Sequence, residues 1–131
     1  MAGAFNIQPD EAIAVDVTFA RQPDANESIY GELGKGPMIG FSPVLDRRMS
    51  KALIDIAKIY AIPYQTEVMG SRTGTNADEI QICGPGVKCA VLSVPIRNMH
   101  TSGEICNVRD VEYTAHLLAE YLLRGGNANA I

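Results

Sequence analysis

The sequence carries a carboxylate and an imidazole at the ends of two separate apolar runs, where such side chains could bind a metal. Asp16 interrupts the apolar run 12–18, and His100 closes the run 91–100. In α/β proteins, oxygen and imidazole ligands reach a divalent metal from the ends of neighbouring strands. A catalytic zinc site needs three protein ligands and a two-metal site needs more, so these two residues predict only part of a metal site.

Each of these residues also has an interpretation without a metal. A buried carboxylate must be paired, hydrogen-bonded or metal-bound, so Asp16 could instead accept hydrogen bonds from backbone N–H groups of a turn. His100 could be a hydrogen-bonded loop histidine, whereas His116 falls inside a helical pattern and suits packing or solvation. Glu104 could orient the His100 imidazole, or it could be a surface charge.

Two glycine-containing segments bear on ligand binding. The polar segment 70–76 can bring backbone N–H groups close to an anion or a substrate carbonyl, or can be a plain connection. The segment 34–37 fails the Walker pattern, and no Gly-x-Gly-x-x-Gly follows the first strand, which excludes nucleotide binding. No serine lies in a Gly-x-Ser-x-Gly elbow, so an esterase triad has no support.

Composition narrows the class of protein. The 131 residues make one domain or a piece of one, and 47% hydrophobic with 20% charged residues is typical of a soluble globule. A net charge of −4 gives no reason to expect nucleic acid, and no apolar run could span a membrane. The three cysteines fit neither a disulfide framework nor a zinc motif, so we expect reduced, mostly buried thiols in a cytoplasmic protein.

Hydrophobic periodicity predicts alternating strands and helices. The predicted strands are 11–18, 37–42, 64–69 and 88–95, and the predicted helices are 46–60, 76–82 and 110–123. The patterns of 11–18 and 88–95 predict strands that are mostly buried on both faces. The segment 37–42 is predicted to be an edge strand, because Pro37 cannot donate a hydrogen bond to a neighbouring strand. Residues 125–131 are expected to form a loose tail.

The patterns also make specific predictions for the helices. Asp46 is a favourable charge at the start of its helix, and Asn76 is a candidate N-cap. The last helix has an apolar face with Asp110 near its start. The predicted members of that face are Val111, Ala115, Leu118 and Leu122.

This order predicts a three-layer α/β fold, with mainly parallel central strands and helices on both faces of the sheet. Ligands bind such sheets beyond the carboxyl ends of the strands. Asp16, the loop 70–77 and the loop 98–104 all fall at such ends. We therefore expect these three segments to converge on one edge of the sheet.

Five motifs together resemble one known family. In chain order they are Ala14–Thr18, Leu33–Pro37, Ile62–Gln65, Gly74–Ala77 and Arg97–Thr101. Their order resembles the glutamyl and tetrahedral aminopeptidases, metallopeptidases also labelled cellulase M or endoglucanase M. The resemblance covers nearly the whole chain and implies a zinc-peptidase-like catalytic domain.

The resemblance implies site residues and cofactors. The family uses two metals, zinc or cobalt, with a bridging water and a glutamate as general base. By motif, Asp16 would ligate one metal and His100 the other, whereas Gly74, Thr75 and Asn76 would line the substrate pocket. Many relatives have aspartate in place of Asn76, which removes a charge here.

The resemblance also implies that the chain is truncated. The family's first histidine ligand, bridging aspartate and Glu-Glu pair lie upstream of the Asp16 motif, and residues 1–15 contain none of them. We therefore expect residues 1–131 to be the C-terminal portion of the catalytic domain, with no catalytic residue and no peptidase activity alone. The missing strands would leave a sheet edge open to self-association or to a complementing N-terminal chain.

Two other functions remain as alternatives to a peptidase fragment acting on peptide N-termini. One is a non-catalytic subunit or pseudoenzyme that binds a complementing chain. The other is a glycan hydrolase, as the cellulase label suggests, but the chain has no Trp and no evident pair of carboxylates flanking a glycosidic bond.

Overall fold

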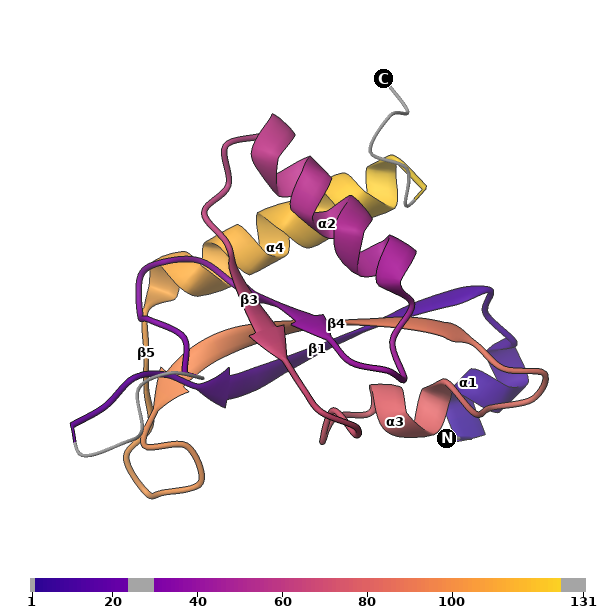
Figure 1. The fold of residues 1–131 in the computed structure, drawn as a ribbon, viewed down its shortest axis with the longest axis horizontal. Helices are drawn as coiled ribbons and strands as arrows, with labels where there is room; N and C mark the ends of the chain where they lie inside the picture. The colour runs from indigo at the N-terminus through magenta and orange to yellow at the C-terminus, as the bar shows by residue number, and fades with distance from the viewer. Residues whose placement is uncertain (1, 24–29, 126–131) are drawn as a thin grey trace.

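The computed structural model describes residues 2–23 and 30–125, which fold into a mixed sheet covered by helices on both faces (Figure 1). In chain order the elements are α1 (Ala2–Ile7), β1 (Glu11–Phe19), β2 (Met38–Phe41), α2 (Arg47–Ile59), β3 (Gln65–Val68), α3 (Ala77–Ile80), β4 (Lys88–Arg97), β5 (Ile105–Cys106) and α4 (Val108–Leu123). Apart from Gly125, the predicted tail lies outside the described residues. No helix among the described residues is long and apolar enough to cross a membrane.

The sheet has the strand order β1-β4-β2-β3, with β5 pairing beside β4. β1 is parallel to β4 and β2 is parallel to β3, but β2 and β4 are antiparallel. The predicted α/β fold with its parallel strand pairs is confirmed. The antiparallel pair at the centre was not predicted, and it reverses the direction of β3 relative to β1.

The predicted three layers are present because β4 is apolar on both faces. Leu92 faces a core cluster with α2 and α4, whereas Val91 faces a second cluster with Ala77 of α3. Figure 1 accordingly has α2 and α4 on one side of the sheet and α1 and α3 on the other. The short α1 was not predicted, and it contributes no buried residue.

Two strand predictions are wrong about position in the sheet. The strand predicted at 37–42 is the central β2, buried between β4 and β3, and Pro37 is tolerated because it precedes the ladder. The strand predicted at 11–18 is the edge strand β1 rather than one buried on both faces. Its Val15, Val17 and Phe19 side chains are 40–50% exposed.

The helix starts follow local chemistry. Asp46 is the N-cap of α2, accepting hydrogen bonds from the backbone N–H groups of Arg48 and Met49, as expected for a charge at a helix N-terminus. Asn76 occupies the N-cap position of α3, as predicted, but its side chain makes no capping hydrogen bond. The Thr75 hydroxyl accepts from the Ala77 N–H instead, at 3.2 Å.

Of the predicted apolar face of α4, only Leu118 packs against the core. Its buried residues are Asp110, Thr114, Leu117 and Tyr121. Asp110 is fully buried, and its two carboxylate oxygens accept hydrogen bonds from Gly34 N–H (2.7 Å) and Gly36 N–H (2.8 Å). This pairing satisfies the buried charge, so α4 turns a partly polar face inward and leaves Val111 and Leu122 exposed.

Candidate functional site

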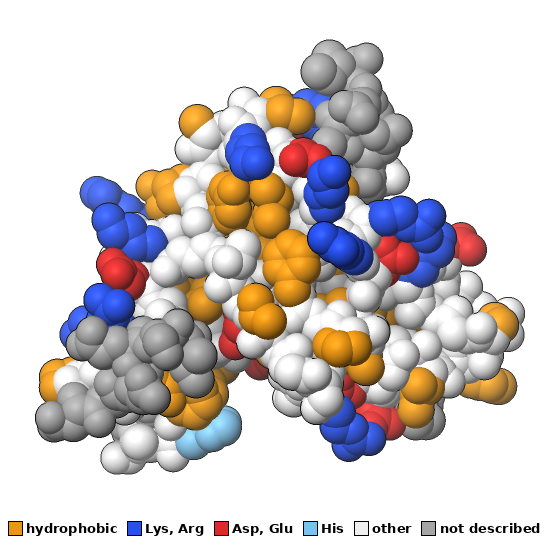
Figure 2. Space-filling view, viewed as in Figure 1, with side chains coloured by type: hydrophobic (Ala, Val, Ile, Leu, Met, Phe, Trp, Pro, Cys, Tyr) orange, Lys and Arg blue, Asp and Glu red, His pale blue; other side chains and the backbone are white. Residues whose placement is uncertain are grey.

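One cavity, of about 330 Å³, collects most of the residues that the sequence singled out. Its wall is formed by β1, β3, β4, the loop after β3 and the loop after β4. The lining residues are Asp16, Val17, Thr18, Phe19, Glu67, Met69, Thr73, Gly74, Thr75, Ser93, Met99 and His100. In Figure 2 the lower edge of the molecule is hollowed, and a histidine side chain borders the hollow.

The expected convergence of three segments therefore occurs, but for a different reason. β1 and β4 are parallel, so Asp16 and the loop containing His100 belong to the same end of the sheet. β3 runs in the opposite direction, since β2 and β4 are antiparallel. The loop 70–76 reaches the cavity because the chain crosses back beneath the sheet to α3, which contacts β1 and β4 (Figure 1).

Asp16 is half-buried on β1, directly opposite Ser93 of β4 in the register. One oxygen of its carboxylate, Oδ1, accepts a hydrogen bond from the Val17 N–H at 2.8 Å. The donor is the next residue of the strand β1, so this is a backbone hydrogen bond but not the turn of the alternative interpretation. No described residue donates to Oδ2, which leaves that oxygen available to a ligand in the cavity.

His100 lies in a tight loop just beyond β4, and its side chain is exposed. Its backbone has a φ of +67°, a conformation that non-glycine residues rarely adopt. The His100 N–H donates to Glu104 Oε1 at 2.7 Å, so Glu104 fixes the backbone of the loop rather than the imidazole. The imidazole packs edge-on against Phe19, with 6.3 Å between ring centroids.

The glycine-containing loop is held by Asp78, which the sequence analysis did not single out. Its carboxylate accepts from the Thr73 N–H, the Thr73 hydroxyl and the Gly74 N–H, at 2.8–3.0 Å. Burial raises the pKa of Asp78, but these hydrogen bonds and the charge of Arg72 outweigh it and hold the pKa below its ordinary value. Gly74 and Thr75 line the cavity, whereas the exposed Asn76 does not.

Glu67 is a second acidic residue that sequence reasoning missed. It comes from β3, and its Oε1 accepts a hydrogen bond from the Thr18 hydroxyl of β1 at 2.5 Å. The alternation of 64–69 could have placed Glu67 on the same face as Gln65. It could not reveal that this face meets Thr18, because β1 and β3 are not neighbours in the sheet.

The donor atoms in the cavity are of the kinds that zinc prefers, but they are too few. Among residues 2–23 and 30–125, no group of three or more His, Cys, Asp or Glu residues could hold a metal ion together. Asp16 and His100 share one cavity without completing a coordination shell. These residues by themselves therefore do not fit a catalytic metal site.

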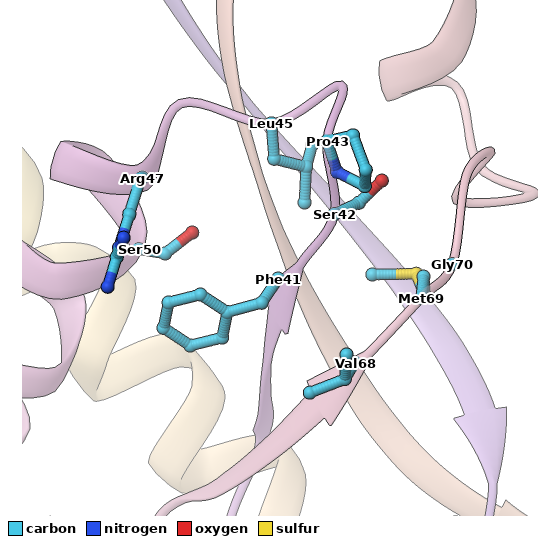
Figure 3. A pocket seen from close by; sticks show the side chains of 9 residues that line it. All are labelled: Phe41, Ser42, Pro43, Leu45, Arg47, Ser50, Val68, Met69 and Gly70. Atoms are coloured by element: carbon cyan, nitrogen blue, oxygen red, sulfur yellow. The ribbon is translucent and has the colours of Figure 1, made fainter.

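A second hollow, of about 370 Å³, lies between α2 and the ends of β2 and β3 (Figure 3). Phe41, Leu45, Val68 and Met69 make its wall largely apolar, and Arg47 is its only ionisable lining residue. It has no acid, base or nucleophile pair. This hollow therefore lacks the acidic and imidazole groups of the cavity of Asp16, Glu67 and His100, with which it shares Met69.

Comparison with known proteins agrees with the motifs. The sequence profile of the M42 glutamyl aminopeptidases matches residues 1–117.

This chain belongs to the M42 aminopeptidase family.

Two proteins similar to this M42 chain are named as aminopeptidases. A lysyl aminopeptidase from Pyrococcus furiosus is 44% identical over 114 residues, which cover 87% of this chain and 33% of the relative. An aminopeptidase from Desulfurococcus kamchatkensis has a TM-score of 0.84 at 30% identity, covering 91% of this chain and 35% of that one. The M42 chain thus spans about a third of the length of these relatives.

A third similar protein forms large assemblies. The TET1 peptidase of Pyrococcus horikoshii has a TM-score of 0.69 at 28% identity, covering 91% of this chain and 36% of that one. That protein assembles into a tetrahedron or a large octahedral shell. Together the comparisons confirm the resemblance drawn from the five motifs and the fold class.

Proposed function

We propose that this chain is the C-terminal portion of an M42 aminopeptidase catalytic domain, which hydrolyses residues from the N-termini of peptides when the domain is complete. The observation that carries the proposal is the single cavity shared by Asp16, His100, Gly74 and Thr75. These residues come from three of the five family motifs. Peptide hydrolysis needs ligands and polar groups around one space, and this cavity supplies part of that set.

The resemblance implies that Asp16 and His100 would each ligate one divalent ion, zinc or cobalt. The described residues supply too few donors for either ion, so the chain alone should not hydrolyse peptides. The purified chain is to be incubated with zinc or cobalt salts and aminoacyl chromogenic substrates. We expect no turnover above the metal-salt blank, and turnover that co-purifies with the chain would contradict this expectation.

A measurement of zinc affinity shows whether the chain alone retains a partial metal site. Zinc affinity is to be measured by calorimetry for the wild type, for the double variant Asp16→Ala, His100→Ala, and for His116→Ala as a control on the exposed histidine of α4. We expect weak binding that the double variant loses and the control keeps. Equal binding by all three proteins would remove Asp16 and His100 from the proposed metal site.

A second candidate function is a non-catalytic subunit that binds a complementing N-terminal chain. The exposed Val15, Val17 and Phe19 of the edge strand β1 favour it. The complementing chain would bring the missing ligands, while self-association through β1 would give a homo-oligomer. Light scattering after size exclusion is to be measured for the chain alone and for the chain mixed with an upstream M42 segment. A homo-oligomer would appear in the first sample and a complex of the two chains in the second. A clean monomer in both samples would count against self-association and against the complementing chain.

The remaining expectations follow from the same proposal. None of the three cysteines forms a disulfide, which supports a cytoplasmic location. A glycan hydrolase is not favoured, because Phe19 is the only Phe, Tyr or Trp side chain that lines the cavity, among the residues that the structure describes.

A further inference from the structure

The charge of the cavity is one-sided among its lining residues. Among the described residues that line it, Asp16 and Glu67 are acidic, His100 is the only group that could be cationic, and there is neither Lys nor Arg. The remaining polar groups are hydroxyls and backbone. A ligand that brings a positive charge into this space would therefore gain attraction without meeting a fixed cation.

Glu67 is held in one orientation and keeps an acceptor for a ligand. The Thr18 hydroxyl binds Oε1, which costs the side chain rotational freedom before any ligand arrives. No described residue donates to Oε2. Glu67 is half-buried as a residue, and a free oxygen on such a carboxylate is a good acceptor for an ammonium or guanidinium group.

The surroundings of Glu67 suit the rest of a basic side chain. Met69 follows the last residue of β3 and lines the same cavity, as do Phe19 and Met99. Lysine and arginine have apolar stems that pack on such surfaces while the charged end reaches a polar partner. At about 330 Å³ the cavity is at the lower end of the range for small-molecule sites, which suits one amino-acid residue.

We propose that Glu67 is a specificity-determining residue, which selects peptides whose first residue carries a cationic side chain. The proposal deepens the aminopeptidase function above and rests on it. In that function the resemblance would assign Asp16 to a metal ion. Glu67 is the other carboxylate among the described lining residues, and its hydrogen bond to Thr18 fixes where the cationic group is received.

The test is a binding measurement on the full 131-residue chain, which needs no turnover. L-Lysinamide and L-norleucinamide share the backbone and the four-carbon stem and differ by the terminal ammonium. Each is titrated into ¹⁵N-labelled protein, with the amide signals of Thr18, Glu67, Gly74 and Thr75 followed by NMR. We expect lysinamide to bind roughly fivefold more tightly, with the largest shifts at Thr18 and Glu67.

Three variants locate the charge that is responsible. Glu67→Gln keeps an acceptor for Thr18 and removes only the charge, so the preference for lysinamide should fall to about onefold. Glu112→Gln, at an exposed position of α4, should leave the preference unchanged. Asp16→Asn should retain most of it.

Specific outcomes overturn the proposal. If the wild type binds lysinamide and norleucinamide with equal affinity, the proposal is overturned. This result needs no variant, so the test remains decisive even if the Glu67→Gln protein does not fold. A preference that survives Glu67→Gln, or one lost only in Asp16→Asn, also overturns it. A preference lost in Glu67→Gln, with no peptidase activity on adding an upstream M42 segment, would instead refute the proposed function and keep Glu67 as a cation receptor.

Discussion

Replacing Asp110 should destabilise this fold more than any surface change on the same helix. Its carboxylate is fully buried and joins the first turn of α4 to the loop that leads into β2, through the N–H groups of Gly34 and Gly36. Asp110→Ala removes both acceptors and leaves two N–H groups without a partner. Asp110→Asn retains one oxygen and loses the charge.

The strength of these two hydrogen bonds sets the expected loss of stability. A hydrogen bond to a charged group contributes about 1.5–3 kcal/mol, so losing two should cost about 3–6 kcal/mol in Asp110→Ala. Asp110→Asn should lose about half of that, about 2 kcal/mol. Because domains are stable by only about 5–15 kcal/mol, the alanine variant is expected to be partly or wholly unfolded.

Urea unfolding followed by circular dichroism measures these effects. With a slope of about 1–3 kcal/mol per M, Asp110→Asn should lower the midpoint by about 1 M. Glu112→Ala, two residues along α4 and exposed, is the matched control and should change stability by less than about 0.5 kcal/mol. Hydrogen exchange should show selective loss of protection at the Gly34 and Gly36 amides.

Equal urea midpoints for Asp110→Asn and Glu112→Ala would contradict this prediction. A lower midpoint for Asp110→Asn, with the Gly34 and Gly36 amides still protected from exchange, would contradict it as well. In either case the two hydrogen bonds would not be what stabilises this buried charge.

Two further predictions concern acid stability and thiol reactivity. Because the pKa of Asp78 is lowered in the folded state, its stabilisation should be complete above the unfolded pKa, about 3.9, and be lost as the pH falls through the folded value. Asp78→Asn should therefore flatten the decline of the urea midpoint in acid, and an NMR pKa for Asp78 at or above the ordinary value would contradict this. A thiol reagent at neutral pH should label the exposed Cys106 rapidly and the buried Cys83 and Cys89 only after denaturation, since burial raises the pKa of Cys89 to about 11. Rapid labelling that persists in Cys106→Ser would show that another thiol is accessible.

The sequence predicted those features of the fold that depend on residues close together in the chain. In the run 88–95 the residues that alternate to each face are mainly apolar, so a strand buried on both faces follows from the local pattern. Asp46 precedes a helical repeat and caps α2 with the next residues in the chain. The five motifs identified the family because their spacing is also a local property.

What it could not predict depends on distant partners. β2 is central because β4, some fifty residues later, pairs with it, and nothing within 37–42 indicates that. The inward face of α4 depends on N–H groups of Gly34 and Gly36 that receive the Asp110 carboxylate. The segment 34–37 does bind an anion through its backbone, but the anion is this carboxylate and not a phosphate. Glu67 was missed for the same reason, because its partner Thr18 lies on a strand that is not its neighbour.

The pairing of β1 with β4 has a consequence for how the chain folds during synthesis. Val15 pairs with Leu92, so β1 emerges from the ribosome long before β4, its long partner among the described strands. Until β4 is made, Val15, Val17 and Phe19 lack this pairing, while β2, α2 and β3 can already form their local contacts. β1 should therefore dock late, and slowed translation between residues 40 and 90 should raise the yield of aggregated nascent chain.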